Sequence, residues 1–294
     1  MIDNQTYTLV DNQSGEMAFK LYRFESLRHF DQIQRLNHYS IIWIQSGNGI
    51  AMIDTEKYAY SADQIFTCAP YQPFMFQADI RTQGVVISFH PNFFCIHKHH
   101  TEIACDGVLF NNIYQSPYLV INKSENEKLG WIVSEIEKDI QQNHLAISES
   151  VLSYLKLILI NCSRIKKNNY PEIQLDETQD QEKFIVQRLK EFIETKFKAL
   201  HSPKEYADLL NISPNALSKV VKTACNKTPS ALIAERIIIE AKRELYLTDK
   251  SVEEIASELG YEDTFYFSRF FKKHTNISPS IYRKTVGYNR AASL

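Results

Sequence analysis

The chain has 294 residues, 44% of them apolar, which is enough for two domains of ordinary size with separate cores, and its net charge is −2. The first twenty residues hold no apolar run, and the most apolar stretch, 151–160, has about half the length of a bilayer span, so we expect neither a secretory signal nor a membrane-spanning helix. The five irregularly spaced cysteines exclude a disulfide framework, so we expect a soluble, cytoplasmic protein.

Residues 18–90 are predicted to form β-structure. Short apolar and aromatic runs at 39–45, 50–53, 65–68 and 85–89 are separated by turn signals, and no helical pattern falls between them. Closely spaced short strands of this kind predict a sandwich or a small barrel.

The predicted barrel is rich in aromatic side chains. A pocket with a mostly apolar wall and few polar groups suits a small organic molecule. The candidate effector-binding residues are His38, Trp43, Tyr71, Phe74 and Phe76. The alternative is that each of these side chains only fills the core.

A cluster of soft and imidazole ligands follows the last predicted strand. It consists of Cys95, His97, His99, His100 and Cys105, and such ligands together suit zinc. The spacing matches no standard zinc module, and the cluster does not line the predicted barrel. We expect a polar connection here and no metal site.

Residues 125–142 and 147–165 are predicted to be two amphipathic helices. The second is apolar around most of its circumference, and a lone barrel seldom covers so wide a surface, so we expect part of it to meet a second subunit. The candidate dimerisation residues are Val151, Leu152, Leu155 and Leu159. In the alternative interpretation both helices close the barrel. The polar, acidic residues 166–180 that follow are the best candidate for an interdomain linker.

Residues 202–230 predict a helix, a tight turn and a second helix. Ser202 and Glu205 have the spacing of a capping box, and Pro203 stands at the first helical position, where its missing N–H costs nothing. The second helix is amphipathic. Its inward face holds Leu217, Val220, Val221 and Ala224, and its outward face holds Asn215, Ser218, Lys219 and Lys222.

Residues 251–282 repeat this pattern about fifty residues later along the chain. Ser251 and Glu254 have the spacing of a second capping box, and Gly260 can adopt the left-handed conformation that ends a helix. The following helix is again amphipathic. Its inward sector holds Phe267, Phe270, Phe271 and His274, and its opposite side holds Phe265, Ser268, Arg269 and Lys272.

The two copies agree residue by residue. Ser218, Lys219 and Lys222 match Ser268, Arg269 and Lys272, and Asn226 matches Asn276. Each asparagine stands where a second helix must end, since asparagine is the next best residue after glycine for a left-handed turn. Between the copies, 229–247 predicts a helix about 28 Å long, close to one turn of DNA at about 34 Å. This length would place both second helices in successive major grooves.

The residues expected to contact DNA are Asn215, Ser218, Lys219, Lys222, Thr264, Phe265, Ser268, Arg269 and Lys272. Arg269 carries a planar fork that addresses two acceptors of guanine, whereas Lys219 is a flexible point charge and should discriminate less. Lys222 and Lys272 lie nearer the flank of each helix, where phosphate is the expected partner. The competing interpretation of Arg269 is an ion pair with Glu262 or another acid of the domain.

Positive charge gathers in this part of the chain. Residues 1–170 hold 14 basic and 17 acidic side chains, whereas residues 181–294 hold 19 basic and 14 acidic ones, a net charge of +5. Phosphate binding requires such a distribution, but many domains that bind no nucleic acid share it. The charge agrees with the motifs without establishing their function.

The layout resembles the DNA-binding domain of the AraC/XylS-type bacterial transcription regulators. The resemblance covers residues 181–286 and rests on Gly260-Tyr261-Glu262-Asp263, on the run from Tyr266 to Lys273, on Ser278-Pro279 and on Tyr282-Arg283. Asn226 and Asn276 depart from the glycine that is more common in the family, and Val221 stands where an aromatic residue is common.

The order of strands and turns in 18–90 also resembles the cupin-like sensor domain found in front of such DNA-binding domains. Together the resemblances imply a multidomain α+β protein. Its expected parts are a cupin-like β-barrel with two helices at 1–170, which senses an effector and carries dimerisation, a linker at 171–180, and an all-α domain of two helix-turn-helix units joined by a long helix at 181–294.

We therefore expect a dimeric transcription regulator that binds double-stranded promoter or operator DNA, responds to a small organic effector, contacts RNA polymerase and needs no cofactor. The alternative is a cupin-type metalloenzyme with an accessory helical domain. Against it, the two histidines and the glutamate of cupin metal sites are missing, and His38 stands alone. A helical protein-interaction domain is a third interpretation, but it does not explain basic residues at matching positions of both second helices.

Overall fold

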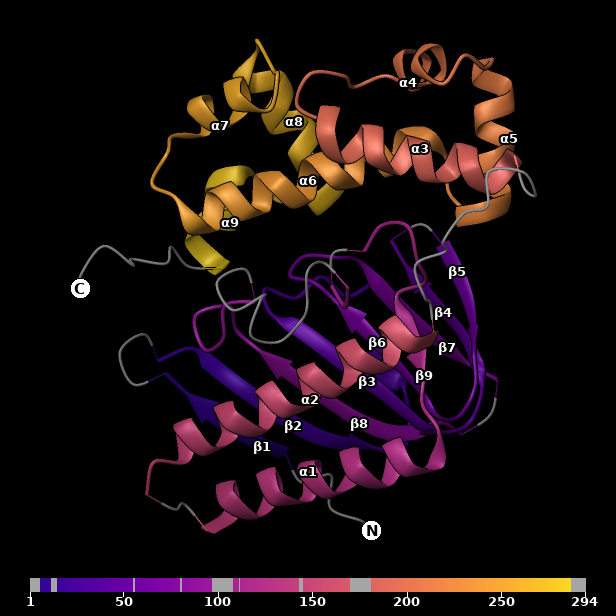
Figure 1. Cartoon of the computed structure of the whole chain (residues 1–294). Helices are drawn as coiled ribbons and strands as arrows, with labels where there is room; N and C mark the ends of the chain where they lie inside the picture. Colours follow the sequence, from indigo (N-terminus) through magenta and orange to yellow (C-terminus); the bar gives the residue numbers. More distant parts are fainter. Residues whose placement is uncertain are drawn as a thin grey trace. The chain divides into compact units, whose positions relative to one another are not determined.

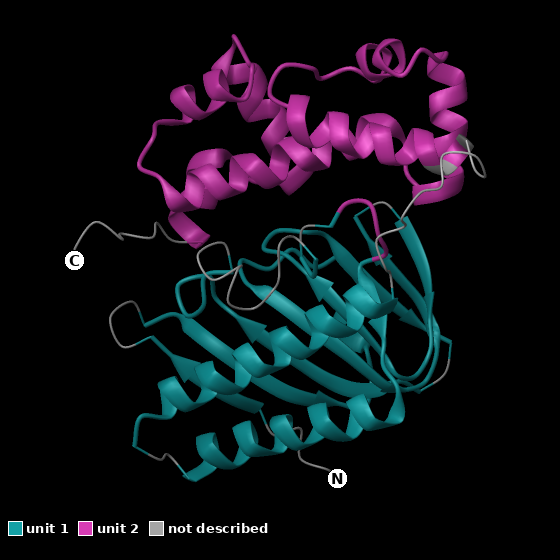
Figure 2. Cartoon of the chain, viewed as in Figure 1, with its two compact units in different colours: residues 1–112, 117–171 teal, residues 113–116, 172–294 magenta. Residues whose placement is uncertain are grey.

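The computed structural model divides the chain into two compact units (Figure 2). Unit 1 comprises residues 1–112 and 117–171, and unit 2 comprises residues 113–116 and 172–294. The residues that the structure describes are 6–11, 15–54, 56–79, 81–96, 108–110, 112–142, 145–169 and 181–286. The predicted linker at 171–180 lies outside the described residues, and its boundaries stay a prediction.

Unit 1 contains two antiparallel sheets (Figure 1). The larger has the strand order β1 (Thr6–Val10), β2 (Met17–Phe24), β8 (Gln83–Phe89), β3 (Tyr39–Ser46), β6 (Gln64–Cys68) and β9 (Tyr118–Val120). The smaller has the order β5 (Glu56–Tyr60), β4 (Gly49–Ile53) and β7 (Phe74–Ala78), with the short 3-10 helix η1 (Arg28–Phe30) against β7. The four β-runs predicted from the sequence are confirmed as β3, β4, β6 and β8.

Of the sandwich and the small barrel that the sequence allowed, the structure has two separate sheets and no closed barrel among the described strands. Among the described strands, pairing stays within each sheet. The chain passes from β3 to β4 through Gly47, whose φ of 97° strains any residue with a side chain, and from β6 to β7 through Pro70 and Pro73. Proline donates no hydrogen bond to a ladder. At both places the chain leaves the larger sheet and enters the smaller one.

Strand β3 lies inside the larger sheet and is buried on both faces. Tyr39, Ile41 and Trp43 point to one face and Ile42 and Ile44 to the other, because successive side chains of a strand alternate. The first set packs against two helices, and the second packs against the smaller sheet. Unit 1 therefore has one apolar core on each face of the larger sheet.

The two helices are α1 (Lys123–Gln142) and α2 (Ile147–Asn169), and both lie across one face of the larger sheet (Figure 1). They run antiparallel to each other. Lys128 Nζ donates to Asn161 Oδ1 at 2.7 Å, and farther along the pair Ser150 Oγ donates to the Asp139 carboxylate. Both helices that the sequence predicted in this region are confirmed.

Three of the four residues predicted at a subunit interface lie inside unit 1. Val151, Leu155 and Leu159 are 0% exposed, and Leu152 is half-buried. Helix α2 is apolar over a wide arc because it packs against both the sheet and α1, so no second subunit is needed to explain that arc. This corrects the prediction for the three buried residues and supports the alternative in which both helices cover the sheet.

Unit 2 is helical in its described part. Its helices are α3 (Gln181–Lys196), α4 (Pro203–Leu209), α5 (Pro214–Cys225), α6 (Pro229–Leu247), α7 (Val252–Glu258), α8 (Thr264–Thr275) and α9 (Pro279–Val286). Arg236 of α6 binds Glu194 of α3 at 2.7 Å, and its guanidinium carbon lies 3.9 Å from the ring centre of Phe197. Near the end of α6, Arg283 of α9 donates to the carbonyl oxygen of Leu245 at 3.1 Å. These contacts hold the first and last helices of the unit against α6.

Unit 2 also includes the short segment 113–116. The Tyr114 hydroxyl donates to Glu194 Oε1 at 3.0 Å, and Lys227 Nζ donates to the carbonyl oxygen of Ile113 at 3.3 Å. Burial raises the pKa of Tyr114, and the neighbouring Glu194 raises it further, so the hydroxyl remains a donor.

Candidate nucleic-acid interface

The candidate interface is formed by two helix pairs of unit 2, α4 with α5 and α7 with α8. Both first helices begin at the predicted capping boxes. Ser202 N donates to Glu205 Oε2 at 2.8 Å and Ser251 N donates to Glu254 Oε2 at 2.6 Å, while each serine side chain accepts from the glutamate N–H. The hydrogen bonds from Ser202 and Ser251 lower the pKa of both carboxyl groups. Both capping boxes are confirmed.

The second helices of the two pairs begin and end alike. Helix α5 begins at the N-cap Ser213, and α8 begins at the N-cap Asp263; each side chain accepts a backbone N–H of its own first turn. Helix α5 ends at Asn226 with a φ of 54°, and α8 ends at Asn276 with a φ of 69°. Both asparagines therefore adopt the left-handed conformation that the sequence predicted.

Helix α5 presents its predicted polar face to solvent. Asn215, Ser218, Lys219 and Lys222 are all exposed. On the opposite face Leu217 and Val221 are 0% exposed and Val220 is 7% exposed, as predicted. Ala224 was predicted to face inward and is exposed, because it stands in the last turn, next to the end of the helix. The correction does not alter the outward face.

Helix α8 repeats the arrangement with larger side chains. Phe267 and Phe271 are 0% exposed and form its inward face. Phe265, Arg269 and Lys272 are exposed, whereas Thr264, Ser268, Phe270 and His274 are half-buried. Of the nine residues predicted to contact DNA on α5 and α8, seven are thus exposed and two are partly accessible.

Arg269 forms a long ion pair with Asp263, an acid of its own domain. Its Nη2 atom lies 3.9 Å from Asp263 Oδ2, and the two side chains are 71% and 57% exposed. The same Asp263 carboxylate caps α8 by accepting the Phe265 N–H at 2.7 Å. An exposed pair at this distance contributes about 0–1 kcal/mol, so Asp263 restrains the guanidinium without occupying it.

Tyr266 is an exposed aromatic residue that the sequence prediction missed. It is 56% exposed and stands next to Phe265, which is 76% exposed, at the beginning of α8. Its ring leans on Tyr261 with the centroids 5.9 Å apart. At 100° per residue Tyr266 falls at the edge of the sector that contains Phe267, so the helical period alone did not assign it to either face.

The five predicted effector-binding residues do not gather at one place in unit 1. Trp43 is 3% exposed and belongs to the core under the helices, whereas Phe74 and Phe76 are each 1% exposed and belong to the core between the sheets. His38 and Tyr71 are half-buried. The larger sheet separates Trp43 from the two phenylalanines, so these three residues do not line one pocket.

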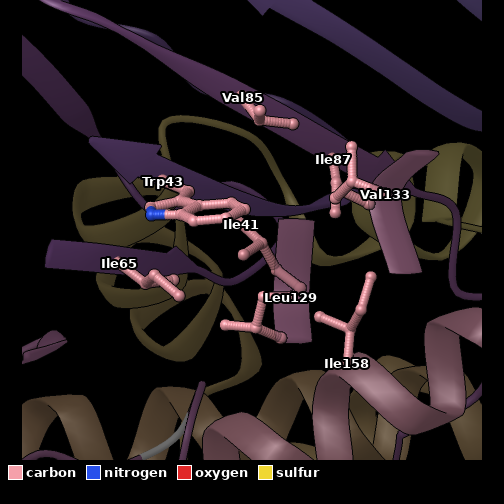
Figure 3. A pocket seen from close by; sticks show the side chains of 8 residues that line it. All are labelled: Ile41, Trp43, Ile65, Val85, Ile87, Leu129, Val133 and Ile158. Carbon is pink, nitrogen blue, oxygen red and sulfur yellow. The ribbon is translucent and has the colours of Figure 1, made fainter. Parts of the chain in front are cut away.

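Trp43 borders a small apolar cavity between the larger sheet and the helices (Figure 3). The other lining residues are Ile41, Ile65, Val85, Ile87, Leu129, Val133 and Ile158. The cavity has a volume of about 10 Å³, roughly what one water molecule needs, so it holds no organic molecule in this conformation. The indole N–H of Trp43 has no hydrogen-bond partner among the described residues.

His38 is a neutral side chain at ordinary pH. Burial lowers its pKa to about 4, and the charges of His90 and Lys20 act in the same direction. Its Nδ1 lies 3.1 Å from Asn37 Oδ1. The imidazole therefore offers a hydrogen bond and no charge to its surroundings.

Only part of the cysteine and histidine cluster considered for zinc lies within the described residues. Among the described residues there is no group of three histidine, cysteine, aspartate or glutamate side chains that could hold a metal ion. Of the cluster considered for zinc, Cys95 is described and buried, while His97, His99, His100 and Cys105 lie outside the described residues. Within that same part of the chain, no helix has both the length and the apolar content to cross a membrane.

Residues 206–285 match a protein family described as a helix-turn-helix domain. The raffinose operon transcriptional regulatory protein RafR of Pediococcus pentosaceus is 40% identical over 78 residues, which cover 26% of this chain and 28% of that protein. The transcriptional activator RhaS of Yersinia pestis is 23% identical over 248 residues, which cover 82% of this chain and 85% of that protein.

Among solved structures, apo ToxT from Vibrio cholerae is 16% identical, with 96% of this chain and 97% of that chain covered and a TM-score of 0.40. The chain spans between about a quarter and a half of the length of the first three curated relatives, at 28%, 43% and 45%.

Proposed function

We propose that this chain, whose residues 206–285 form a helix-turn-helix domain of the AraC/XylS type, is a sequence-specific DNA-binding transcription regulator. The observation that carries the proposal is the duplicated exposed face. Serine, a basic residue and lysine stand at equal positions of α5 and α8, over a buried apolar face and between matching caps. A helix pair that only packs within a protein does not need basic side chains at matching exposed positions.

The distance between the two helix pairs suits one face of a DNA duplex. Helix α6 joins them with 19 residues, about 28 Å of helix. Successive major grooves on one side of DNA lie about 34 Å apart. Helices α5 and α8 would therefore occupy neighbouring major grooves, and the target site would consist of two half-sites about one turn apart.

The two helices would contribute unequally to sequence selection. Arg269 reads guanine through two parallel hydrogen bonds, and Phe265 meets a thymine methyl group or a base edge. Lys219 holds the place of Arg269 on α5 but donates from a flexible ammonium, which discriminates less. Lys222 and Lys272 bind phosphates and set the position of each helix.

Selection from random duplex DNA tests the proposal directly. The full chain is incubated with a random-sequence pool, the bound fraction is amplified, and the selected duplex is footprinted. We expect two protected segments about one helical turn apart, with the stronger consensus in the half-site of α8. A pool that never rises above its initial affinity would refute sequence-specific binding.

For unit 1 we propose a sensing role for a small organic effector. Among the described residues the buried Trp43 N–H has no hydrogen-bond partner, and it lies at the wall of an apolar cavity, so a ligand with an apolar body and one acceptor would satisfy it. Because the cavity is small, binding would have to move α1 or α2. A library of aromatic acids, fatty acids and sugars that shifts neither the melting temperature nor the DNA affinity would refute this role.

We further infer that the chain forms a homodimer through the outer face of the α1–α2 pair. Trp131 is 58% exposed and Leu157 is 44% exposed. The hydrogen bond from Lys128 to Asn161 sets an antiparallel register that places positions 131 and 157 at about the same level of the two helices. Tryptophan is enriched at protein interfaces, and an exposed pair of this kind favours burial against a second subunit.

A matched pair of substitutions tests the dimer. Leu157→Glu should lower the dimer fraction in sedimentation velocity, whereas Leu145→Glu, the same change at a residue that is 99% exposed elsewhere in unit 1, should not. A wild-type protein that sediments as a monomer at micromolar concentration would refute the dimer.

The remaining features of the proposal follow from its class. We propose that the protein acts in the cytoplasm, where bacterial promoters are, and that it performs no catalysis; the relatives named above are transcription regulators. A contact with RNA polymerase stays a prediction from the resemblance.

A further inference from the structure

The two helix-turn-helix units touch each other directly, apart from their connection through α6. The segment 197–202 leads from α3 into α4, and its His201 stacks on Tyr261, which lies in the turn between α7 and α8. The ring centroids are 4.7 Å apart and the ring planes differ by 27°. A residue just before α4 therefore packs face to face on a residue in the turn before α8.

Each of these two residues is also held by contacts within its own helix pair. The backbone N–H of His201 donates to Glu205 Oε2 at 3.1 Å, which ties it to the beginning of α4. Tyr261 is 9% exposed, and its ring centroid lies 5.3 Å from that of Phe267 and 5.5 Å from that of Phe270, both on α8. A rotation of α8 relative to α4 would have to separate the stacked rings or break these anchors.

The backbone of the two segments is also in close contact beside the stacked rings. Gly260 has a φ of 79°, and a side-chain carbon added to it would collide with the carbonyl oxygen of Lys198 and lie 3.3 Å from His201 Cε1. The turn between α7 and α8 thus packs directly on the segment 197–202, which precedes α4. Glycine at 260 serves both the helix end and this close approach.

His201 keeps its position although it leaves a polar atom unsatisfied. Its Nε2 atom is buried and has no hydrogen-bond partner among the described residues. A buried polar atom without a partner destabilises the fold, and the packing of the ring against Tyr261 has to offset that loss. Phenylalanine at position 201 would keep an aromatic ring on Tyr261 and remove the unsatisfied nitrogen, so His201→Phe separates the stack from the polar atom.

We propose that His201 is a positioning residue for DNA recognition, because its stack on Tyr261 fixes the distance and rotation between α5 and α8. The inference rests on the proposed function. Without the stack, α6 and the contact of Gly260 with Lys198 would still join the two helix pairs, but the pairs would twist more freely about the axis of α6 and accept half-sites at several spacings. With the stack in place the protein selects operators by the spacing of their half-sites as well as by sequence, because each inserted base pair rotates one half-site by about 34° around the duplex.

The test uses the selected duplex with its native spacing and two derivatives with one and two base pairs inserted between the half-sites. Affinities are measured by fluorescence anisotropy for the wild type, His201→Ala and His201→Phe. We expect the wild type to lose at least tenfold in affinity when two base pairs are inserted. His201→Ala should lose less than threefold, and His201→Phe, which keeps an aromatic ring on Tyr261, should behave as the wild type does.

The spacing ratio is internal to each protein preparation, so a lower folded fraction in a variant does not change it. The inference is overturned if His201→Ala shows the same spacing penalty as the wild type, or if the wild type shows none. A wild type that binds single half-sites tightly but ignores spacing overturns only the positioning role. A wild type that prefers no selected duplex over random DNA overturns the proposed function as well.

Discussion

Replacing Arg269 by alanine separates base reading from a structural role for this side chain. Its partner within the domain is Asp263, at 3.9 Å, and both side chains are more than half exposed. An exposed pair of that geometry contributes about 0–1 kcal/mol to folding. We therefore expect Arg269→Ala to change the free energy of unfolding by less than about 1 kcal/mol, since Asp263 keeps its role as the cap of α8.

The effect on DNA should be larger and confined to the cognate site. A bidentate contact from arginine to guanine is worth about 1–3 kcal/mol of discrimination, which corresponds to a roughly 5- to 150-fold loss in affinity. Random DNA offers only phosphates to the guanidinium, so the loss there should stay small. Competition binding on both DNAs at one salt concentration measures the difference, with Arg164→Ala, an exposed arginine of α2, as the control for charge.

Two results would refute this reasoning. Equal losses on cognate and random DNA would reduce Arg269 to a phosphate contact or a general support of the fold. A fall in the melting temperature that accounts for the whole loss of binding would show that the pair with Asp263 is a structural one.

Three further predictions follow from the burial and charge of single residues. Lys272→Ala should weaken binding to cognate and random DNA alike and lower the slope of log K against log salt by about one, as salt titrations would show; an unchanged slope would exclude a phosphate contact. The pKa of His38 is lowered from 6.5 to about 4, so the unfolded chain binds a proton at a higher pH than the folded one, and stability should fall by about 3 kcal/mol as the pH drops from 6.5 to 4. Urea unfolding at a series of pH values measures that loss, and His38→Gln should reduce it. Leu155→Ala should lower the free energy of unfolding by about 2–5 kcal/mol without changing the sedimentation coefficient of the folded protein, because this side chain is 0% exposed inside unit 1; a dissociated, fully stable variant would contradict this.

The helix-turn-helix units could be predicted in detail because their signals are local. A capping box joins Ser251 to Glu254 within one turn, and the left-handed ends at Asn226 and Asn276 depend on one residue each. The inward and outward faces of α5 and α8 follow from a period of 3.6 residues, which needs no knowledge of the rest of the chain. The exceptions, Ala224 and Tyr266, stand at a helix end and at a sector edge, where that period says least.

In unit 1 the sequence predicted strands β3, β4, β6 and β8 but not which neighbours cover their faces. An apolar run such as that of β3 is buried on both sides, and its pattern does not tell which neighbour covers which face. Trp43 was therefore grouped with Phe74 and Phe76, although the larger sheet lies between them. The interface assigned to Leu155 was wrong for the same reason, because the wide apolar arc of α2 meets a sheet and a helix of its own chain.

The sequence by itself determined four strands of unit 1, the helices α1 and α2, which faces of α5 and α8 are polar, and that the C-terminal part contains the same helix pair twice. Only the tertiary structure decided which apolar surfaces meet, that the strands form two sheets instead of a barrel, and that His201 stacks on Tyr261. The physical reason is the range of the interactions. Caps and helical periodicity act over about one helical turn. His201 and Tyr261 are sixty positions apart and meet only because the packing of α3 against α6 brings their two helix pairs together.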